Sequence, residues 1–426
     1  MPAEVTENSR APIASPIGLT QIACAVFFLS WALPPSLYSR YMDEPDLLFF
    51  DPTTLVFFAL CVAFFLLGAW LIAWLFPLPG PHSLERRLKV SPIAFLLIPV
   101  VIGIGACIAS CVLMLKEYPE IFLALLSAQG EAIKNSDLSQ HAPLGLANIW
   151  LLGVLWWAVW ESSRLPLSSG QRLLAKCIIG IGFVCCLVDA TLKVSRVEVI
   201  LPIIGGAIVY ACSRERSPRR HLVVLGVVGA SAIALFLAFD LLRGGEWDGM
   251  VANLIGYTMT SYNRLSAVLH GRLKYEFGGR GTYLFPFLAF NNQLNAIIPF
   301  RIMFHWPTFD DWWRSEFTGV WNAGLNGGYI WSGAFGYIFA DLGWLSPLWI
   351  FVYGLFYGCA WRAIKVGSTA GVVLYPWFGF CILFWSGTNY LVDNKLLVLV
   401  LDAAALGIYK KFLSSRTLGP MTSVKV

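Results

Sequence analysis

The sequence predicts an all-α polytopic membrane protein with about ten transmembrane helices and one long loop. Two observations support this prediction: the apolar composition and the lengths of the apolar runs. The residue types AVILMFWYC make up 58% of the 426 residues and charged residues only 13%, whereas roughly a quarter of the residues of ordinary globular proteins are charged. A chain of this composition cannot cover itself with polar surface, so most of its exterior must face lipid. We therefore exclude a soluble multidomain protein and expect no nucleic-acid partner.

The predicted helices follow from apolar runs of roughly the 17–25 residues that a helix needs to cross a bilayer. Residues 1–17 form a polar tail that lacks the basic region and short apolar run of a cleavable signal peptide. Residues 18–242 carry the first seven spans, residues 344–412 the last three, and residues 413–426 form a second tail. The ten predicted spans are 18–38, 53–77, 92–114, 144–161, 173–191, 197–212, 222–242, 344–361, 369–389 and 396–412.

The distribution of lysine and arginine predicts the orientation of these spans, because loops on the cytoplasmic side carry an excess of both. The loops after the even-numbered spans and the C-terminal tail are basic, whereas acidic residues dilute the charge of the opposite short loops. We therefore expect both termini to be cytoplasmic. The basic positions are Arg86, Arg87, Lys89, Arg164, Arg172, Arg214, Arg216, Arg219, Arg220, Arg362, Lys365, Lys410, Lys411 and Arg416.

Residues 243–343 form a long loop on the opposite side, in two parts. Residues 243–280 are polar and cationic, and residues 281–343 are rich in Trp, Asn and Gly. The run 282–300, TYLFPFLAFNNQLNAIIPF, is too short and too polar to cross the bilayer twice. It is typical of a re-entrant or interfacial segment, which needs protein around it at membrane depth.

The residue types of this loop suit two kinds of ligand. Arginines beside a bilayer can hold phosphate or diphosphate oxygens through paired hydrogen bonds. Trp and Tyr faces next to amide groups suit a sugar ring, which has apolar faces and polar hydroxyls. The same tryptophans also suit an interfacial aromatic belt, and acids in the loop could make several arginines structural ion-pair partners. The candidate residues are Arg243, Tyr262, Arg264, His270, Arg272, Arg280, Asn326, Trp331, Tyr337 and Asp341.

A second candidate group is KVSRVEV at 193–199, where one predicted span ends and the next begins. Lys193 and Arg196 are three residues apart and would share a helix face, with Glu198 one turn further in. Such a basic pair could point into an internal cavity, because charges at membrane depth are costly and tend to be functional. The alternative is that both side chains snorkel to the interface. Asp402 lies deepest in an apolar run and needs a partner in the bundle.

The cysteines predict neither disulfides nor a metal site. All ten lie inside apolar runs rather than in polar loops, so no disulfide framework is expected. Cys107 and Cys111 share a helix face, but no His or carboxylate joins them in the sequence. We interpret both as small packing residues.

The arrangement as a whole resembles the Wzy-type polymerases of O-antigen and exopolysaccharide repeat units. The resemblance rests on the number and orientation of the spans, on Ser195 and Arg196 opening a mid-chain helix, and on the long loop. That loop closes in GAFGYIFADLGWLSPLWIFVYGLFYGCAWRA, which holds Gly336, Tyr337 and Asp341 and runs into an aromatic span with a basic end.

The resemblance implies a membrane glycosyltransferase of the GT-C type in a bacterial inner membrane, with the long loop periplasmic. It would move a growing glycan from undecaprenyl diphosphate onto a new lipid-linked repeat unit. Its partners would be these donor and acceptor lipids, the bilayer and a chain-length-regulating membrane co-polymerase. Fixed guanidinium groups could stabilise the leaving diphosphate without a metal or cofactor. Catalytic roles are implied for Arg196, Arg264, Arg280 and His270, and substrate binding for Lys193, Arg243, Tyr262, Arg272, Asn326, Trp331, Tyr337 and Asp341.

Three other classes stay open. An O-antigen ligase would share the topology and the leaving group but use a different acceptor, with His270 or His305 as its loop histidine. A transporter or flippase would more typically show broken helices in matching halves, and the sequence has no visible internal repeat. A structural membrane subunit is the third class.

Overall fold

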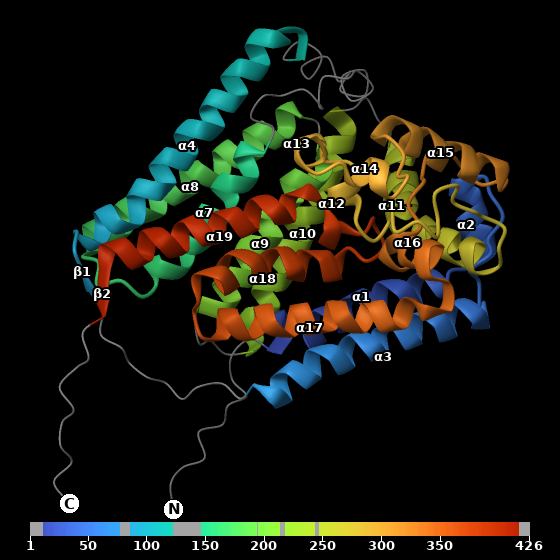
Figure 1. Cartoon of the computed structure of the whole chain (residues 1–426), viewed down its shortest axis with the longest axis horizontal. Coiled ribbons are helices and arrows are strands. Elements are labelled where there is room, and N and C mark those ends of the chain that lie inside the picture. The colour runs from blue at the N-terminus through green and yellow to red at the C-terminus, as the bar shows by residue number, and fades with distance from the viewer. Residues whose placement is uncertain are drawn as a thin grey trace, which may run out of the picture.

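The computed structural model describes residues 12–76, 86–121, 146–193, 195–213, 218–242 and 247–416, and most of them are helical. A helix occupies each of the ten predicted spans (Figure 1). These helices are α1 (Pro16–Trp31), α3 (Pro52–Leu75), α4 (Pro92–Glu117), α7 (Ala147–Ser162), α8 (Ser169–Leu192), α9 (Arg196–Ser213), α10 (Pro218–Leu242), α17 (Ser346–Lys365), α18 (Thr369–Leu383) and α19 (Asn394–Leu413).

The remaining elements are shorter or lie outside the predicted spans. They are the helices α2 (Pro35–Met42), α11 (Trp247–Leu269), α12 (Pro286–Ala289), α13 (Asn292–Ile297), α14 (Phe300–Met303), α15 (Phe309–Asn322) and α16 (Gly333–Leu342), the 3-10 turns η1 (Pro12–Ala14), η3 (Gly343–Leu345) and η4 (Tyr390–Val392), and the strands β1 (Arg86–Leu88) and β2 (Ser414–Arg416).

Five helices of the described chain are long and apolar enough to cross a membrane: α3, α4, α8, α9 and the continuous segment from α16 to α17. A sixth span results if α1 and α2, which meet at 91°, are counted together. The prediction of a helical membrane protein is therefore confirmed, while the count of ten spans stays a prediction. The shorter helix α7 packs against α4, α8, α9, α18 and α19, and twelve of its sixteen residues are buried.

Side-chain caps fix where several long helices begin. The Asp51 carboxylate accepts hydrogen bonds from the backbone N–H groups of Thr53 and Thr54 at the start of α3, and Ser168 and Gln171 form a capping box at the start of α8. Such caps satisfy N–H groups that have no partner within the helix. Asp393 caps α19 in the same way, and this places its carboxylate beside the cavity described below.

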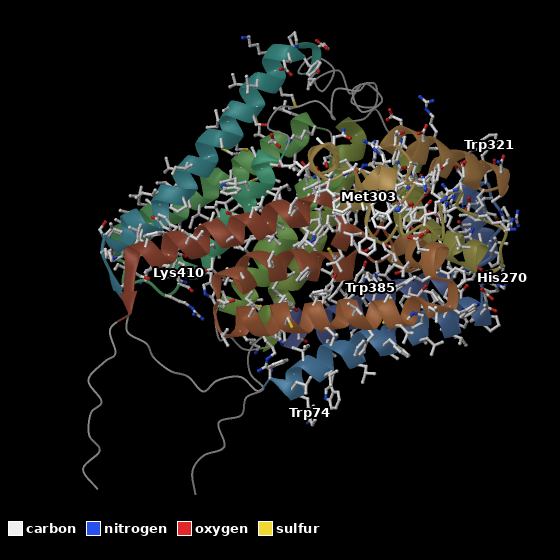
Figure 2. All side chains as sticks on the ribbon, in the orientation of Figure 1. Trp74, His270, Met303, Trp321, Trp385 and Lys410 are labelled. Carbon is white, nitrogen blue, oxygen red and sulfur yellow. The ribbon has the colours of Figure 1, made fainter. Side chains whose placement is uncertain are left out.

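The long helices run between two chemically different ends. At one end β1 pairs antiparallel with β2, near both ends of the described chain; the opposite end holds α2 and α12–α15 (Figure 1). Lys410 marks the first end, and His270 and Trp321 mark the second (Figure 2). The second end is assembled from segments of residues 243–343, the predicted long loop.

Residues 247–269, in the cationic part of the predicted long loop, form the helix α11. Both ends of α11 contact the same end of the bundle: Asn253 accepts a hydrogen bond from Tyr329, and Arg264 pairs with Glu44. The helix therefore lies across this end and does not add a span. Its polar residues Thr260, Ser261, Asn263, Arg264 and Ser266 are all buried.

The run 282–300 forms broken short helices, α12 and α13, and α14 follows it directly. Pro286 and Pro299 begin turns there, and proline cannot supply the N–H that a longer helix needs. The segment therefore does not cross the bundle, in agreement with the prediction that it is too short and polar to span twice.

Candidate functional site

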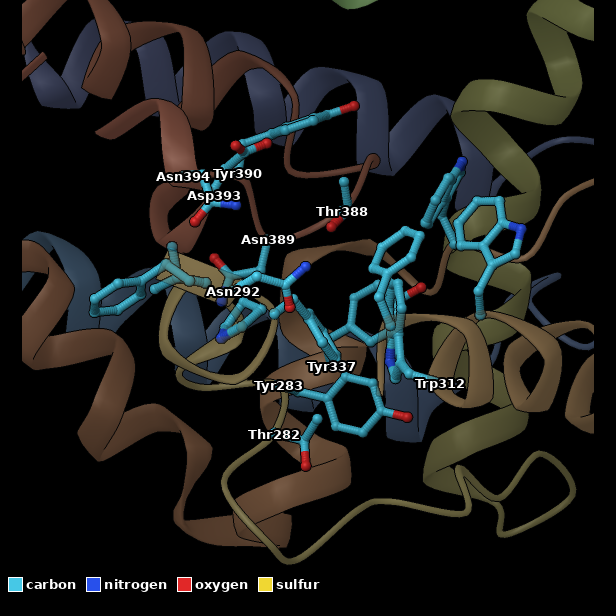
Figure 3. Close-up of a pocket in the computed structure, with 17 residues that line it drawn as sticks. Thr282, Tyr283, Asn292, Trp312, Tyr337, Thr388, Asn389, Tyr390, Asp393 and Asn394 are labelled. Carbon is cyan, nitrogen blue, oxygen red and sulfur yellow. The ribbon is translucent and has the colours of Figure 1, made fainter. Parts of the chain in front are cut away.

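A cavity of about 480 Å³ opens where the segments after α11 fold back onto the connection between α18 and α19 (Figure 3). This volume lies within the roughly 300–1,000 Å³ typical of small-molecule sites. Aromatic rings form most of the wall, and hydroxyl, amide and carboxylate groups interrupt it. The cavity is lined by Thr282, Tyr283, Pro286, Phe287, Phe290, Asn292, Phe309, Trp312, Trp313, Trp331, Tyr337, Thr388, Asn389, Tyr390, Val392, Asp393 and Asn394.

Asp341 builds one side of the cavity by holding the backbone of residues 281–284. Its carboxylate accepts hydrogen bonds from the N–H groups of Gly281 at 3.1 Å, Tyr283 at 2.8 Å and Leu284 at 3.0 Å. Asp341 belongs to the last turn of α16, so these bonds attach the segment before α12 to that helix. Tyr283 is thereby fixed in the wall.

The helix α15 supplies three rings of the aromatic wall. Phe309, Trp312 and Trp313 are spaced three and four residues apart, so they share one helix face and line the cavity. The rings of Trp313 and Trp331 have centroids 5.6 Å apart, and those of Phe290 and Trp312 lie 5.0 Å apart. Each tryptophan is thus held by neighbouring rings.

The polar wall comes from residues 388–394, which connect α18 to α19. Asn389 donates a hydrogen bond to the Tyr353 hydroxyl at 3.2 Å. The Asp393 carboxylate accepts from the backbone N–H of Lys395 at 3.0 Å and contacts its Nζ at 3.1 Å. Lys395 Nζ also lies 3.9 Å from Glu198, so a polar chain extends from the cavity to α9.

A fully buried carboxylate lies beneath the aromatic wall. Glu316 accepts hydrogen bonds from the hydroxyls of Tyr283 at 2.6 Å and Tyr337 at 3.2 Å, and both tyrosines line the cavity. Burial raises the pKa of the Glu316 carboxyl from its ordinary value of 4.5 to about 8, although the two tyrosine hydrogen bonds act to lower it. Glu316 is therefore mostly protonated at pH 7.

This shift predicts a pH-dependent stability. The folded protein keeps the Glu316 proton up to about pH 8, whereas an unfolded chain loses it near 4.5. The stabilisation from that proton is complete below pH 4.5 and is lost as the pH rises toward 8. Melting temperatures between pH 5 and 9 should therefore fall more for the wild type than for Glu316→Gln, which cannot ionise. The exposed Glu276→Gln is the matched control; wild-type and Glu316→Gln curves that stay parallel would contradict the assignment.

Three of the predicted site residues belong to this cavity. Trp331 and Tyr337 line it, and Asp341 fixes its wall. Arg196 is not among the residues that line it: its guanidinium is 4.7 Å from the Phe236 ring and 4.9 Å from the Tyr257 ring.

The structure corrects the role expected for Arg264, which is fully buried and paired through both terminal nitrogens. Its Nη1 and Nη2 donate to the two Glu44 oxygens at 2.9 and 2.8 Å, and Nη2 also donates to the Asn326 carbonyl at 2.7 Å. The guanidinium is thus occupied within the protein and does not line the cavity. Asn326 belongs to the same cluster, since its N–H donates to Glu44 at 2.6 Å. Tyr262 packs in the core, 5.1 Å from the Phe27 ring.

The other predicted cations are also held away from the cavity, so the expected convergence of arginines on one cavity is not observed. His270 contacts Asp51 at 3.1 Å. Arg272 donates to the Ala323 carbonyl at 2.9 Å, and the Arg280 guanidinium lies 5.6 Å from the Phe277 ring. Lys193 pairs with Asp189 one turn away at 2.5 Å. Arg243 lies outside the described residues.

A carboxylate does join Cys107 and Cys111, contrary to the sequence analysis. The ligand-type atoms of Cys107, Cys111 and Asp189 all lie within 4.8 Å of one another. Asp189 comes from the neighbouring helix α8, so no local pattern could reveal it. However, the Lys193 ammonium already neutralises Asp189, and a cation there would be repelled.

Asp402 is fully buried and packs against Gly153 of α7. A Cβ atom added at Gly153 would lie only 1.9 Å from Asp402 Oδ2, so the carboxylate needs a glycine at this position.

Sequence reasoning missed Glu316, Asn389 and Asp393 as residues of the site. One signal was available for Glu316: it falls on the same face as Trp312, Trp313 and Val320 of α15, in the middle of an apolar stripe. A carboxylate in that position must be buried. No comparable local signal marks Asn389, because its partner Tyr353 lies on α17. Asp393 did carry a local signal, since it caps α19 and contacts Lys395 two residues later.

The fold and the cavity define a helical membrane protein with an aromatic, amide-lined pocket at one end of its bundle. Comparison with protein-family models, curated proteins and solved structures finds no match to the chain. The functional argument therefore rests on the chemistry of the cavity.

Proposed function

We propose that the protein is a membrane glycosyltransferase that polymerises undecaprenyl-diphosphate-linked oligosaccharide repeat units at the periplasmic face of a bacterial inner membrane. The observation that carries the proposal is the cavity, with tryptophan and tyrosine rings on one wall and hydroxyl and amide groups on the other. Its position at the end opposite the strands fits this reaction, because the basic loops predict that the strand end is cytoplasmic.

The cavity wall matches the two needs of a sugar ring. Apolar C–H faces can stack on Trp312, Trp313 and Trp331, and hydroxyls can bond to Thr388 and Asn394. The donor glycan would leave from its lipid diphosphate, whose developing charge needs a fixed cation. Arg196 is the arginine we assign to this role, and its guanidinium is held over the Phe236 and Tyr257 rings.

An O-antigen ligase is the second candidate, because it would use the same donor. The observation that favours it is the contact between His270 and Asp51 at 3.1 Å, since a carboxylate can orient a histidine base. His270, however, is absent from the cavity lining. The polymerase is therefore the better supported of the two.

The test begins with a strain that lacks the gene. A polymerase predicts accumulation of single lipid-linked repeat units and loss of long chains, both reversed by the wild-type gene. A ligase predicts instead long lipid-linked chains that are not attached to their final acceptor. A strain that retains normal long chains and attachment would contradict both.

Cavity variants connect this phenotype to the site. Trp331→Ala removes one stacking face and should lower kcat/KM of the purified enzyme about tenfold, which corresponds to roughly 1.4 kcal/mol. Trp321→Ala is the matched control, because Trp321 is on the same side of the molecule, outside the cavity lining, and 74% exposed. Equal losses in both variants would contradict the assignment of the cavity.

A further inference from the structure

We infer that Asp393 is the general base of the transfer reaction, the group that takes the proton from the attacking sugar hydroxyl. This inference rests on the proposed glycosyltransferase function and adds a residue that the sequence analysis did not select. It follows from the position of the carboxylate in the cavity and from the partners of the other acids nearby.

Asp393 is the carboxylate among the described residues that line the cavity, and its side chain is 27% exposed. One oxygen accepts the Lys395 N–H at 3.0 Å and the other contacts Lys395 Nζ at 3.1 Å. Each carboxylate oxygen can accept about two hydrogen bonds, so these contacts leave acceptor capacity on both. A sugar hydroxyl bound among the neighbouring groups Thr388, Asn389 and Asn394 could reach it.

The other acids near the cavity are unsuited to this role. Glu316 is fully buried, and each of its oxygens is hydrogen-bonded to a tyrosine hydroxyl, so no substrate hydroxyl can reach it. Burial also raises its pKa to about 8, which keeps it protonated at neutral pH. Asp341 accepts three backbone N–H groups that hold the cavity wall.

Lys395 and Glu198 act as positioning residues for Asp393. The Lys395 ammonium lies between the two carboxylates, 3.1 Å from Asp393 and 3.9 Å from Glu198. Asn148 holds Glu198 by donating a hydrogen bond at 2.7 Å. The ammonium therefore links the two acids and restricts the Asp393 side chain.

The step balances without a further reactant. The oxygen of the acceptor hydroxyl forms a bond to the anomeric carbon of the donor glycan. The bond between that carbon and the diphosphate oxygen breaks, and the lipid diphosphate leaves with the electron pair. The hydroxyl proton moves to the Asp393 carboxylate and is later released to water. General base catalysis of this kind contributes typically 10²–10⁴-fold to the rate.

Asp393→Asn is the informative substitution, because asparagine caps a helix about as well as aspartate but cannot accept the proton. The substrate is the lipid-linked repeat unit extracted from the deletion strain, and the full-length protein is purified in detergent. We expect kcat to fall at least a hundredfold with KM changed less than threefold. The acidic limb of the kcat profile against pH should disappear, and Asp393→Glu should recover part of the rate.

Binding is measured separately, by quenching of tryptophan fluorescence with the delipidated oligosaccharide, and should be unchanged in Asp393→Asn. The exposed Asp310→Asn is the matched control and should keep the wild-type rate and profile. If the wild type polymerises and Asp393→Asn keeps the wild-type kcat and acidic limb, the assignment of Asp393 as the base is wrong, while the proposed function stands. The same conclusion follows if only Glu316→Gln shows a kinetic loss. A wild type that neither binds nor polymerises the repeat unit overturns the proposed function and the assignment with it.

Discussion

Replacing Arg264 with alanine is expected to destabilise the protein by about 3–5 kcal/mol, because it would leave the Glu44 carboxylate buried without its cation. Both side chains are fully buried. Glu44 also accepts hydrogen bonds from the Tyr38 hydroxyl, the Asn263 amide and the Asn326 N–H. The ion pair therefore joins the segment after α2 to α11 and to the turn that precedes α16.

A double-mutant cycle measures this coupling. The melting temperature in detergent and the abundance in membranes should fall strongly in Arg264→Ala and in Glu44→Ala, and the double variant should lose much less than the sum. Arg272→Ala is the control, because Arg272 is more exposed and its Nε donates to a single backbone carbonyl. An Arg264→Ala protein with normal stability and abundance but no activity would instead restore Arg264 as a catalytic residue.

The sequence predicts the long helices well because the bilayer imposes a simple requirement: a span needs about twenty apolar residues in succession. It does not reveal the partners of the polar residues of α11. Asn263, Arg264 and Ser266 are all buried and hydrogen-bonded. Arg264 and Glu44 are 220 positions apart, and no local pattern shows that two such residues will neutralise each other.

The cavity could be predicted only in its chemical type. An aromatic and amide-rich loop correctly indicated rings beside hydrogen-bonding groups, and Trp331 and Tyr337 are both in the wall. The opposite wall, residues 388–394, includes the end of the predicted span 369–389 and the connection after it, where the sequence analysis selected no site residue. The pairing of these two segments depends on how the helices pack, which composition and spacing do not specify. The arginine cluster was misleading for the same reason, since charge alone does not say what a side chain contacts.

In the proposed polymerase, Arg196→Ala is expected to reduce turnover about a hundredfold or more while leaving protein abundance unchanged. Loss of one charge-assisted donor to a developing oxyanion typically costs about 3 kcal/mol. Arg196 begins α9, and its guanidinium lies over the Phe236 ring of α10 and the Tyr257 ring of α11, which contact each other at 5.7 Å. It is therefore fixed in place, whereas a loop arginine could move away from the departing diphosphate.

Arg196→Lys separates this role from simple packing. Lysine keeps the positive charge and can still lie over the two aromatic rings, but it lacks the planar, bidentate geometry that suits a diphosphate. We expect it to restore melting temperature and abundance and to recover little of the polymer. Arg301→Ala and Arg314→Ala remove cations outside the cavity lining and should retain long chains. If Arg196→Ala at normal abundance gives the wild-type distribution of chain lengths, Arg196 serves only to pack α9 against α10 and α11, and another cation must stabilise the leaving diphosphate.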